Sequence, residues 1–86
     1  MKIVSATYAG LERPFTKVKV AVQFEDGTVD EGTILFENEG RDIDFEGFKD
    51  GDRVSEAFPD LDEADWDKIE KPVKEGMVEY DAVVGH

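Results

Sequence analysis

The stretch that decides the fold is KVKVAVQFEDGTVDEGTILF, residues 17–36. Before its centre, valines alternate with polar or small residues, which is the two-residue period of a strand with one buried face. Asp26 and Gly27 are the residue types that favour a tight hairpin turn, and apolar residues resume after them. The stretch therefore predicts a β-hairpin.

The register of this hairpin carries a second prediction. A two-residue turn would set Val20 opposite Thr33, so an apolar side chain would face a polar one across the strands. One additional residue beside Gly32 would instead pair Val20 with Ile34. We therefore expect a β-bulge at Gly32, which would bend the sheet toward closure.

Further strands are expected on both sides of the hairpin. KIVSATYA (2–9) precedes it, and DIDFEGF (42–48) follows it with apolar residues among acids. Near the C-terminus, MVEYDAVV (77–84) alternates apolar and polar residues and predicts a final strand.

The segment FPDLDEADWDKIEK (58–71) predicts a short helix. Asp60 and Glu63 have the spacing of a capping box, in which each side chain accepts a hydrogen bond at the helix start. Trp66 lies on the apolar face of this helix and is expected to be a core anchor. Pro72 disfavours helical geometry in the preceding residue, so we expect a helix from about 60 to 71.

These elements define an α+β fold in one domain, residues 1–86: a twisted antiparallel sheet of four or five strands, open or partly closed as a small barrel, with one short helix packed on it. Four aromatic side chains are expected to be largely buried: Phe24, Phe36, Trp66 and Tyr80. The chain has no cysteine, which excludes disulfides and thiolate ligands and suits a reducing compartment. Its N-terminal sequence predicts no signal peptide or membrane span, so a cytoplasmic protein is expected.

Charge is the feature that departs most from an average protein. The chain has 22 acidic and 10 basic residues and a formal net charge of -12. Glu12 is the only acid in residues 1–24, so the negative charge is concentrated in residues 25–86. This distribution repels nucleic acid and anionic membrane and attracts basic protein surfaces.

Two acidic rows are the candidate partner-binding residues. A helix over 60–71 would align carboxylates along one outward stripe, and a strand over 42–48 would align others on one side. The intervals within each row are comparable with the separation of phosphates along a nucleic-acid strand. The candidate residues are Asp42, Asp44, Glu46, Asp60, Glu63, Asp67 and Glu70.

Catalytic and metal chemistry have little basis in the sequence. Asp50 and Asp52 could contribute to a calcium site, but the twelve-residue ligand loop of an EF-hand is absent. His86 is the only histidine and the last residue, so we expect no histidine-based triad or zinc site, no cofactor and no enzyme activity. Tyr8, Phe15 and Phe48 could line a peptide pocket or simply fill the core.

The sequence therefore predicts a small acidic protein-interaction module. Its expected partner is a basic protein surface, such as that of a nucleic-acid-binding enzyme, which it would occupy as a stoichiometric inhibitor or nucleic-acid mimic. The alternative is a small-barrel adaptor, or a viral or bacterial structural assembly protein without mimicry. In that case the acids would maintain solubility or reflect adaptation to high salt.

Overall fold

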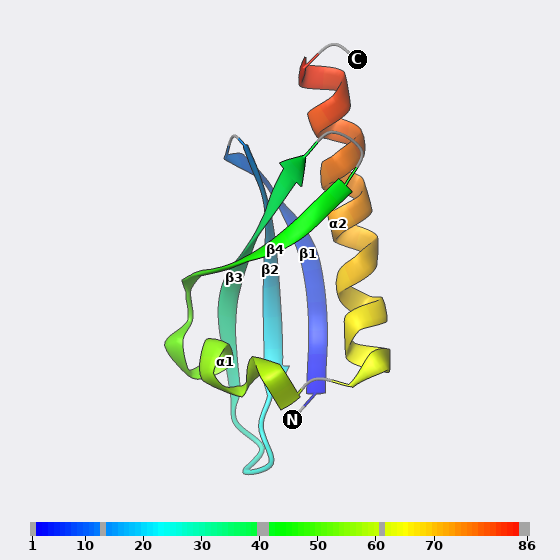
Figure 1. Cartoon of the computed structure of the whole chain (residues 1–86). Helices are drawn as coiled ribbons and strands as arrows, with labels where there is room; N and C mark the ends of the chain where they lie inside the picture. Colours follow the sequence, from blue (N-terminus) through cyan, green and yellow to red (C-terminus); the bar gives the residue numbers. More distant parts are fainter. Residues whose placement is uncertain (1, 13, 40–41, 61, 85–86) are drawn as a thin grey trace.

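The computed structural model describes residues 2–12, 14–39, 42–60 and 62–84. Its elements, in chain order, are β1 (Lys2–Glu12), β2 (Phe15–Gln23), β3 (Val29–Glu39), β4 (Asp42–Asp50), α1 (Asp52–Ala57), the 3-10 helix η1 (Phe58–Asp60) and α2 (Glu63–Val84). The strands form one antiparallel sheet in the order β1-β2-β3-β4 (Figure 1). The α+β prediction is confirmed in this form, with an open sheet whose edges are β1 and β4.

The predicted hairpin is β2–β3, but its turn is longer than expected. The Phe24 N–H donates to the Thr28 carbonyl at 2.9 Å, and the Gly27 N–H donates to the Phe24 carbonyl at 3.0 Å. Gly27 adopts a φ of 87°, which a glycine tolerates without steric cost. The turn is one residue longer than expected, so Val20 pairs with Gly32 and not with Thr33 or Ile34. The register of β2 with β3 is uninterrupted, and the predicted bulge at Gly32 is wrong.

Gly32 serves a different purpose, which is close packing against Gly51. A Cβ atom on Gly51 would lie 2.5 Å from the Gly32 Cα and 2.7 Å from the Glu31 carbonyl oxygen. Gly51 also has a φ of 87°, and α1 begins directly after it. The two glycines therefore allow the chain leaving β4 to turn back against β3.

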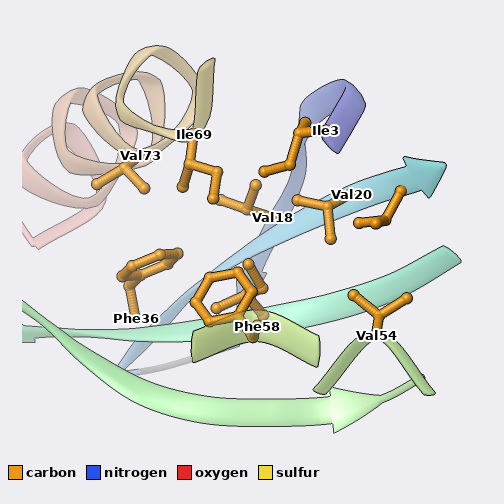
Figure 2. Packing of buried hydrophobic residues seen from close by; sticks show 10 residues of the cluster. Ile3, Val18, Val20, Phe36, Val54, Phe58, Ile69 and Val73 are labelled. Carbon is orange, nitrogen blue, oxygen red and sulfur yellow. The ribbon is translucent and has the colours of Figure 1, made fainter. Parts of the chain in front are cut away.

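The core lies on the face of the sheet that α2 covers. Helix α2 packs mainly on β1 and β2, whereas α1 lies against β3 (Figure 1). Figure 2 shows Ile69 and Val73 of α2 directed toward Val18 and Phe36. The buried cluster consists of Ile3, Val18, Val20, Val22, Ile34, Phe36, Val54, Phe58, Ile69 and Val73.

The C-terminal prediction is wrong, because residues 77–84 belong to α2 and not to a strand. The helix also continues through Pro72, although an interior proline costs about 3 kcal/mol. Pro72, Val73 and Gly76 are buried, so packing of this helix face on the sheet offsets that cost. The alternation of apolar residues after Gly76 is compatible with a strand, but tertiary packing decides the conformation.

The four aromatic side chains expected in the core differ in burial. Phe36 is buried at 5% exposure, as predicted. Phe24 and Tyr80 are half-buried. Trp66 is 40% exposed, so the prediction that it anchors the core is wrong. The sheet-facing side of α2 is formed by Asp65, Ile69 and Val73, and it leaves Trp66 at its margin.

Candidate interaction surface

The start of α2 is capped by a different pair of residues from the one expected. The Asp65 N–H donates to Asp62 Oδ1 at 3.0 Å, and the Asp62 N–H faces Asp65 Oδ2 at 3.5 Å. Asp62 is therefore the N-cap, and the predicted capping box of Asp60 with Glu63 is wrong. Asp60 lies earlier, in η1.

Asp65 and Lys68 also attach α2 to the edge strand β1. The Ile3 N–H donates to Asp65 Oδ1 at 2.9 Å, and Lys68 Nζ donates to the Ile3 carbonyl at 2.9 Å. We call this pair of contacts the Ile3 clasp. Asp65 is only 3% exposed, so this carboxylate has a structural role. Its position four residues before the apolar Ile69 was the available signal that it shares the buried face.

The outward side of α2 carries the predicted acidic row. Glu63, Asp67 and Glu70 are exposed. Glu70 forms an ion pair with Lys74 at 2.7 Å. Among the described residues, Glu63 and Asp67 have no hydrogen bond or ion pair to their side chains. Most of the charge in this row is therefore open to a cationic partner.

The second predicted row is not continued on the face that α2 covers, because Asp44 lies on the other side of the sheet and Glu46 lies at a β-bulge. Asp44 and Glu46 are exposed on β4, and Phe45 between them contacts the buried Phe36 with ring centroids 5.9 Å apart. Successive side chains of a strand alternate between faces, so Asp44 points away from the core face that α2 covers. The structure therefore does not join the two rows into one surface. The side chains of Asp42 and Asp60 lie outside the described residues.

An exposed aromatic cluster lies between β4 and the start of α2. Phe45 is 47% exposed and Trp66 is 40% exposed, while Phe58 between them is 6% exposed. The Phe45 and Phe58 rings stack at 5.4 Å, and Trp66 meets Phe58 edge-on at 4.9 Å. We call these three residues the aromatic patch. Sequence reasoning missed it because it expected Trp66 to be buried.

The expected alternative pocket of Tyr8, Phe15 and Phe48 is not assembled. Phe48 packs against Phe58 with ring centroids 4.9 Å apart. Tyr8 lies on β1, at the opposite edge of the sheet from β4. All three rings are half-buried, which agrees with a role in or near the core.

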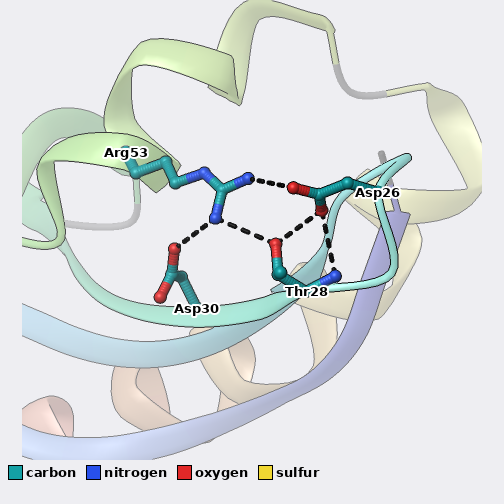
Figure 3. A network of polar contacts seen from close by, with 4 residues as sticks. All are labelled: Asp26, Thr28, Asp30 and Arg53. Atoms are coloured by element: carbon teal, nitrogen blue, oxygen red, sulfur yellow. Dashed lines mark hydrogen bonds and ion pairs between the residues drawn. The ribbon is translucent and has the colours of Figure 1, made fainter.

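Two acids at the hairpin end, Asp26 and Asp30, are paired within the molecule. Arg53 of α1 contacts Asp26 at 3.2 Å and Asp30 at 3.0 Å, and it donates to the Thr28 hydroxyl at 2.9 Å (Figure 3). Its guanidinium carbon lies 3.9 Å from the centroid of the Phe24 ring. Hydrogen bonds from the Thr28 side chain and backbone, together with Arg53, lower the pKa of the Asp26 carboxyl. Asp26 and Asp30 already share a cation, so they are weaker candidates than the α2 row for binding a cationic partner.

Other ligands find little support in the described part of the chain. No group of three or more His, Cys, Asp or Glu side chains there is arranged to hold a metal ion, and this includes the Asp50 and Asp52 segment. No helix in the same residues is long and apolar enough to cross a membrane. Comparison with family models, curated proteins and solved structures finds no match to this chain.

Proposed function

We propose that this chain is a small acidic protein-interaction module that binds a basic protein surface stoichiometrically. The observation that carries the proposal is the outward row of α2, where Glu63 and Asp67 are exposed without a partner among the described residues. Asp26 and Asp30 of the hairpin, in contrast, are paired with Arg53. Unpaired charge of one sign steers partners of the opposite sign and speeds their association.

The partner that best fits this row is a nucleic-acid-binding protein. Glu63, Asp67 and Glu70 are spaced at three and four residues, so adjacent carboxylates lie about 5–6 Å apart at Cβ. Arginines and lysines that bind successive phosphates could bind such a row. The module would then inhibit by competing with nucleic acid, while the exposed acids Asp44 and Glu46 of β4 would add long-range attraction.

The test removes the charge of the α2 row while keeping its shape. The variant carries Glu63→Gln, Asp67→Asn and Glu70→Gln, and it leaves the capping residues Asp62 and Asp65 intact. A basic partner captured from the native host is purified, and its association rate is measured against salt with DNA or RNA as competitor. We expect the variant to associate more slowly and with a shallower salt dependence.

A control variant with the same charge loss separates local contact from net charge. Glu25→Gln, Asp52→Asn and Glu56→Gln change exposed acids outside α2. If both triple variants bind equally well, the α2 row makes no specific contact. Simultaneous binding of nucleic acid and this protein by the partner would exclude competition between them.

The second candidate function is an adaptor or assembly protein whose acids only maintain solubility. The aromatic patch favours it, because exposed apolar clusters rimmed by polar residues mark interaction sites. An adaptor of this kind would bind its partner with little dependence on salt. The same salt titration therefore distinguishes the two candidates.

A further inference from the structure

The aromatic patch and the acidic row meet at Trp66. On a helix, residues three and four positions apart are neighbours on the surface. Asp62 and Glu63 therefore flank Trp66 on one side and Glu70 flanks it on the other. An exposed indole surrounded by carboxylates favours binding of a cation that also has an apolar face.

Competing cations are scarce around this indole. Residues 60–67 contain five acids and no basic residue. Lys68, the next residue, is bound to the Ile3 carbonyl, and Lys74 is paired with Glu70. Lys71 is exposed four residues after Asp67, but it forms no ion pair with Asp67 or Glu63 among the described residues, so both carboxylates remain available next to the patch.

Part of the Trp66 side chain is accessible to a planar cation. Trp66 meets Phe58 edge-on, with an angle of 76° between the ring planes, and is 40% exposed. Tryptophan is the aromatic side chain that attracts cations most strongly. The arginine guanidinium can stack on a ring and donate hydrogen bonds to carboxylates at the same time, whereas the lysine ammonium is compact and strongly hydrated.

We propose that the aromatic patch binds an arginine side chain of the basic partner. Its guanidinium stacks on Trp66 and donates to the carboxylates of Glu63 or Glu70, and its aliphatic stem covers Phe45. This inference rests on the proposed function and names the chemistry of its contact. A second copy of the chain fits the surface poorly, because each copy carries a net charge of -12.

Two defined peptides test the inference without knowledge of the natural partner. They have the same length and glycine-serine spacing, and one carries four arginines where the other carries four lysines. Trp66 is the only tryptophan, so its fluorescence reports contact directly. We expect the arginine peptide to change the emission of Trp66 and to bind several-fold more tightly than the lysine peptide.

Variants at Trp66 separate stacking from apolar contact. Trp66→Leu keeps an apolar side chain but removes the π face, and we expect it to weaken arginine-peptide binding about 3- to 30-fold by calorimetry. Trp66→Phe should restore most of the affinity. Val78→Ala is the matched control, because Val78 is an exposed apolar residue of the same helix and should leave binding unchanged.

The outcomes distinguish this inference from the proposed function. If both peptides bind the original chain equally, or if Trp66→Leu has no effect, the arginine site is excluded. The arginine site can be excluded while the proposed function stands. This is the outcome if the triple acid variant still weakens binding of the captured partner. If Trp66→Leu weakens binding of the partner but the triple variant does not, the acidic row fails together with the hydrogen bonds to Glu63 or Glu70, and only the contact with Trp66 is retained. Thermal melting of each variant confirms that it folds.

Discussion

The two halves of α2 are held to the sheet by different kinds of contact. The N-terminal half combines apolar packing of Ile69 with the Ile3 clasp, in which Asp65 and Lys68 bind one backbone unit of β1. The C-terminal half uses close packing, because a Cβ atom on Gly76 would collide with the Thr16 side chain of β2. Pro72 lies between the halves and lacks the N–H of an ordinary helical residue.

This difference explains how the acidic row of α2 keeps its orientation relative to the sheet. Hydrogen bonds are directional, so the Ile3 clasp sets how the first turns of α2 are rotated about the helix axis. That rotation places Glu63 and Asp67 outward and Trp66 at the margin of the core. Gly76 sets only the distance between helix and sheet. The candidate site therefore depends on the N-terminal half of α2, whose rotation the Ile3 clasp sets.

The largest expected effect comes from filling the Gly76 contact. Gly76→Ala should destabilise the protein by about 2–3 kcal/mol, because overpacking exceeds the helix-propensity gain of alanine. The nearest atom is the Thr16 methyl, so Thr16→Ser should partly rescue the variant. Serine keeps the hydroxyl that contacts Asn38 at 3.2 Å. Denaturant unfolding of the four proteins in a double-mutant cycle measures this coupling.

Absence of coupling in this cycle would contradict the close contact. Additive effects of Gly76→Ala and Thr16→Ser would mean that the helix moves away from β2 at no local cost. The position of the C-terminal half of α2 would then not be fixed by its contact with β2. Asn38 also donates to the Pro14 carbonyl at 2.9 Å, so Asn38 should not be substituted in this test.

A smaller effect is expected from breaking the Ile3 clasp. Asp65→Ala leaves the Ile3 N–H without its acceptor and removes half of the capping pair, which should cost about 1–2 kcal/mol. Asp65→Asn keeps the Oδ1 acceptor and should cost less. Hydrogen exchange of the Ile3 amide reports the clasp directly, and unfolding gives the free energy. Equal losses for alanine and asparagine would assign the effect to the charge of Asp65 and not to the clasp.

The same two halves show what the sequence could and could not predict. The valine alternation of β2 predicts its strand because only one face is buried, and a two-residue period is the side-chain repeat of an extended backbone. After Gly76 the alternation is compatible with a strand or a helix, and the structure continues α2 to Val84. Pro72 by itself predicts the end of a helix, because proline destabilises a helix interior. Packing of α2 on β1 and β2 offsets this loss of helix stability.

The candidate site was predictable only in part, because tertiary contacts decide which side of α2 faces the sheet. The exposure of Glu63 and Asp67 follows from their charge and helical spacing. The exposure of Trp66 does not, because it depends on which neighbours face the sheet. Asp65 occupies a buried position that a large apolar residue would ordinarily take, and its partner is the Ile3 backbone, 62 residues away in the chain. Contacts of this range have no signature in a single sequence.

The smallest expected effect concerns Tyr8, which packs near the C-terminal half of α2. Burial, and then the neighbouring Glu79 carboxylate, raise the pKa of Tyr8 from 10.0 to about 12. Between these values the folded protein keeps a proton that the unfolded chain releases, so this stabilising contribution is complete below about pH 10 and declines as pH rises toward 12. The pKa values of Lys19 and Lys74 are also raised, by Glu31 and Glu70. These lysines therefore also contribute stability that is lost as pH rises.

Tyr8→Phe isolates the tyrosine contribution, because both lysines remain in the variant. Within the described residues the buried Tyr8 hydroxyl forms no hydrogen bond of good geometry, so its removal should cost little at neutral pH. Melting temperatures of the two proteins should therefore be similar near neutral pH. Above about pH 10 the melting temperature of the original chain should fall more steeply than that of the variant. Parallel curves would show that the phenol is open to solvent, and the contact between β1 and the C-terminal half of α2 would then be looser than the Gly76 packing implies.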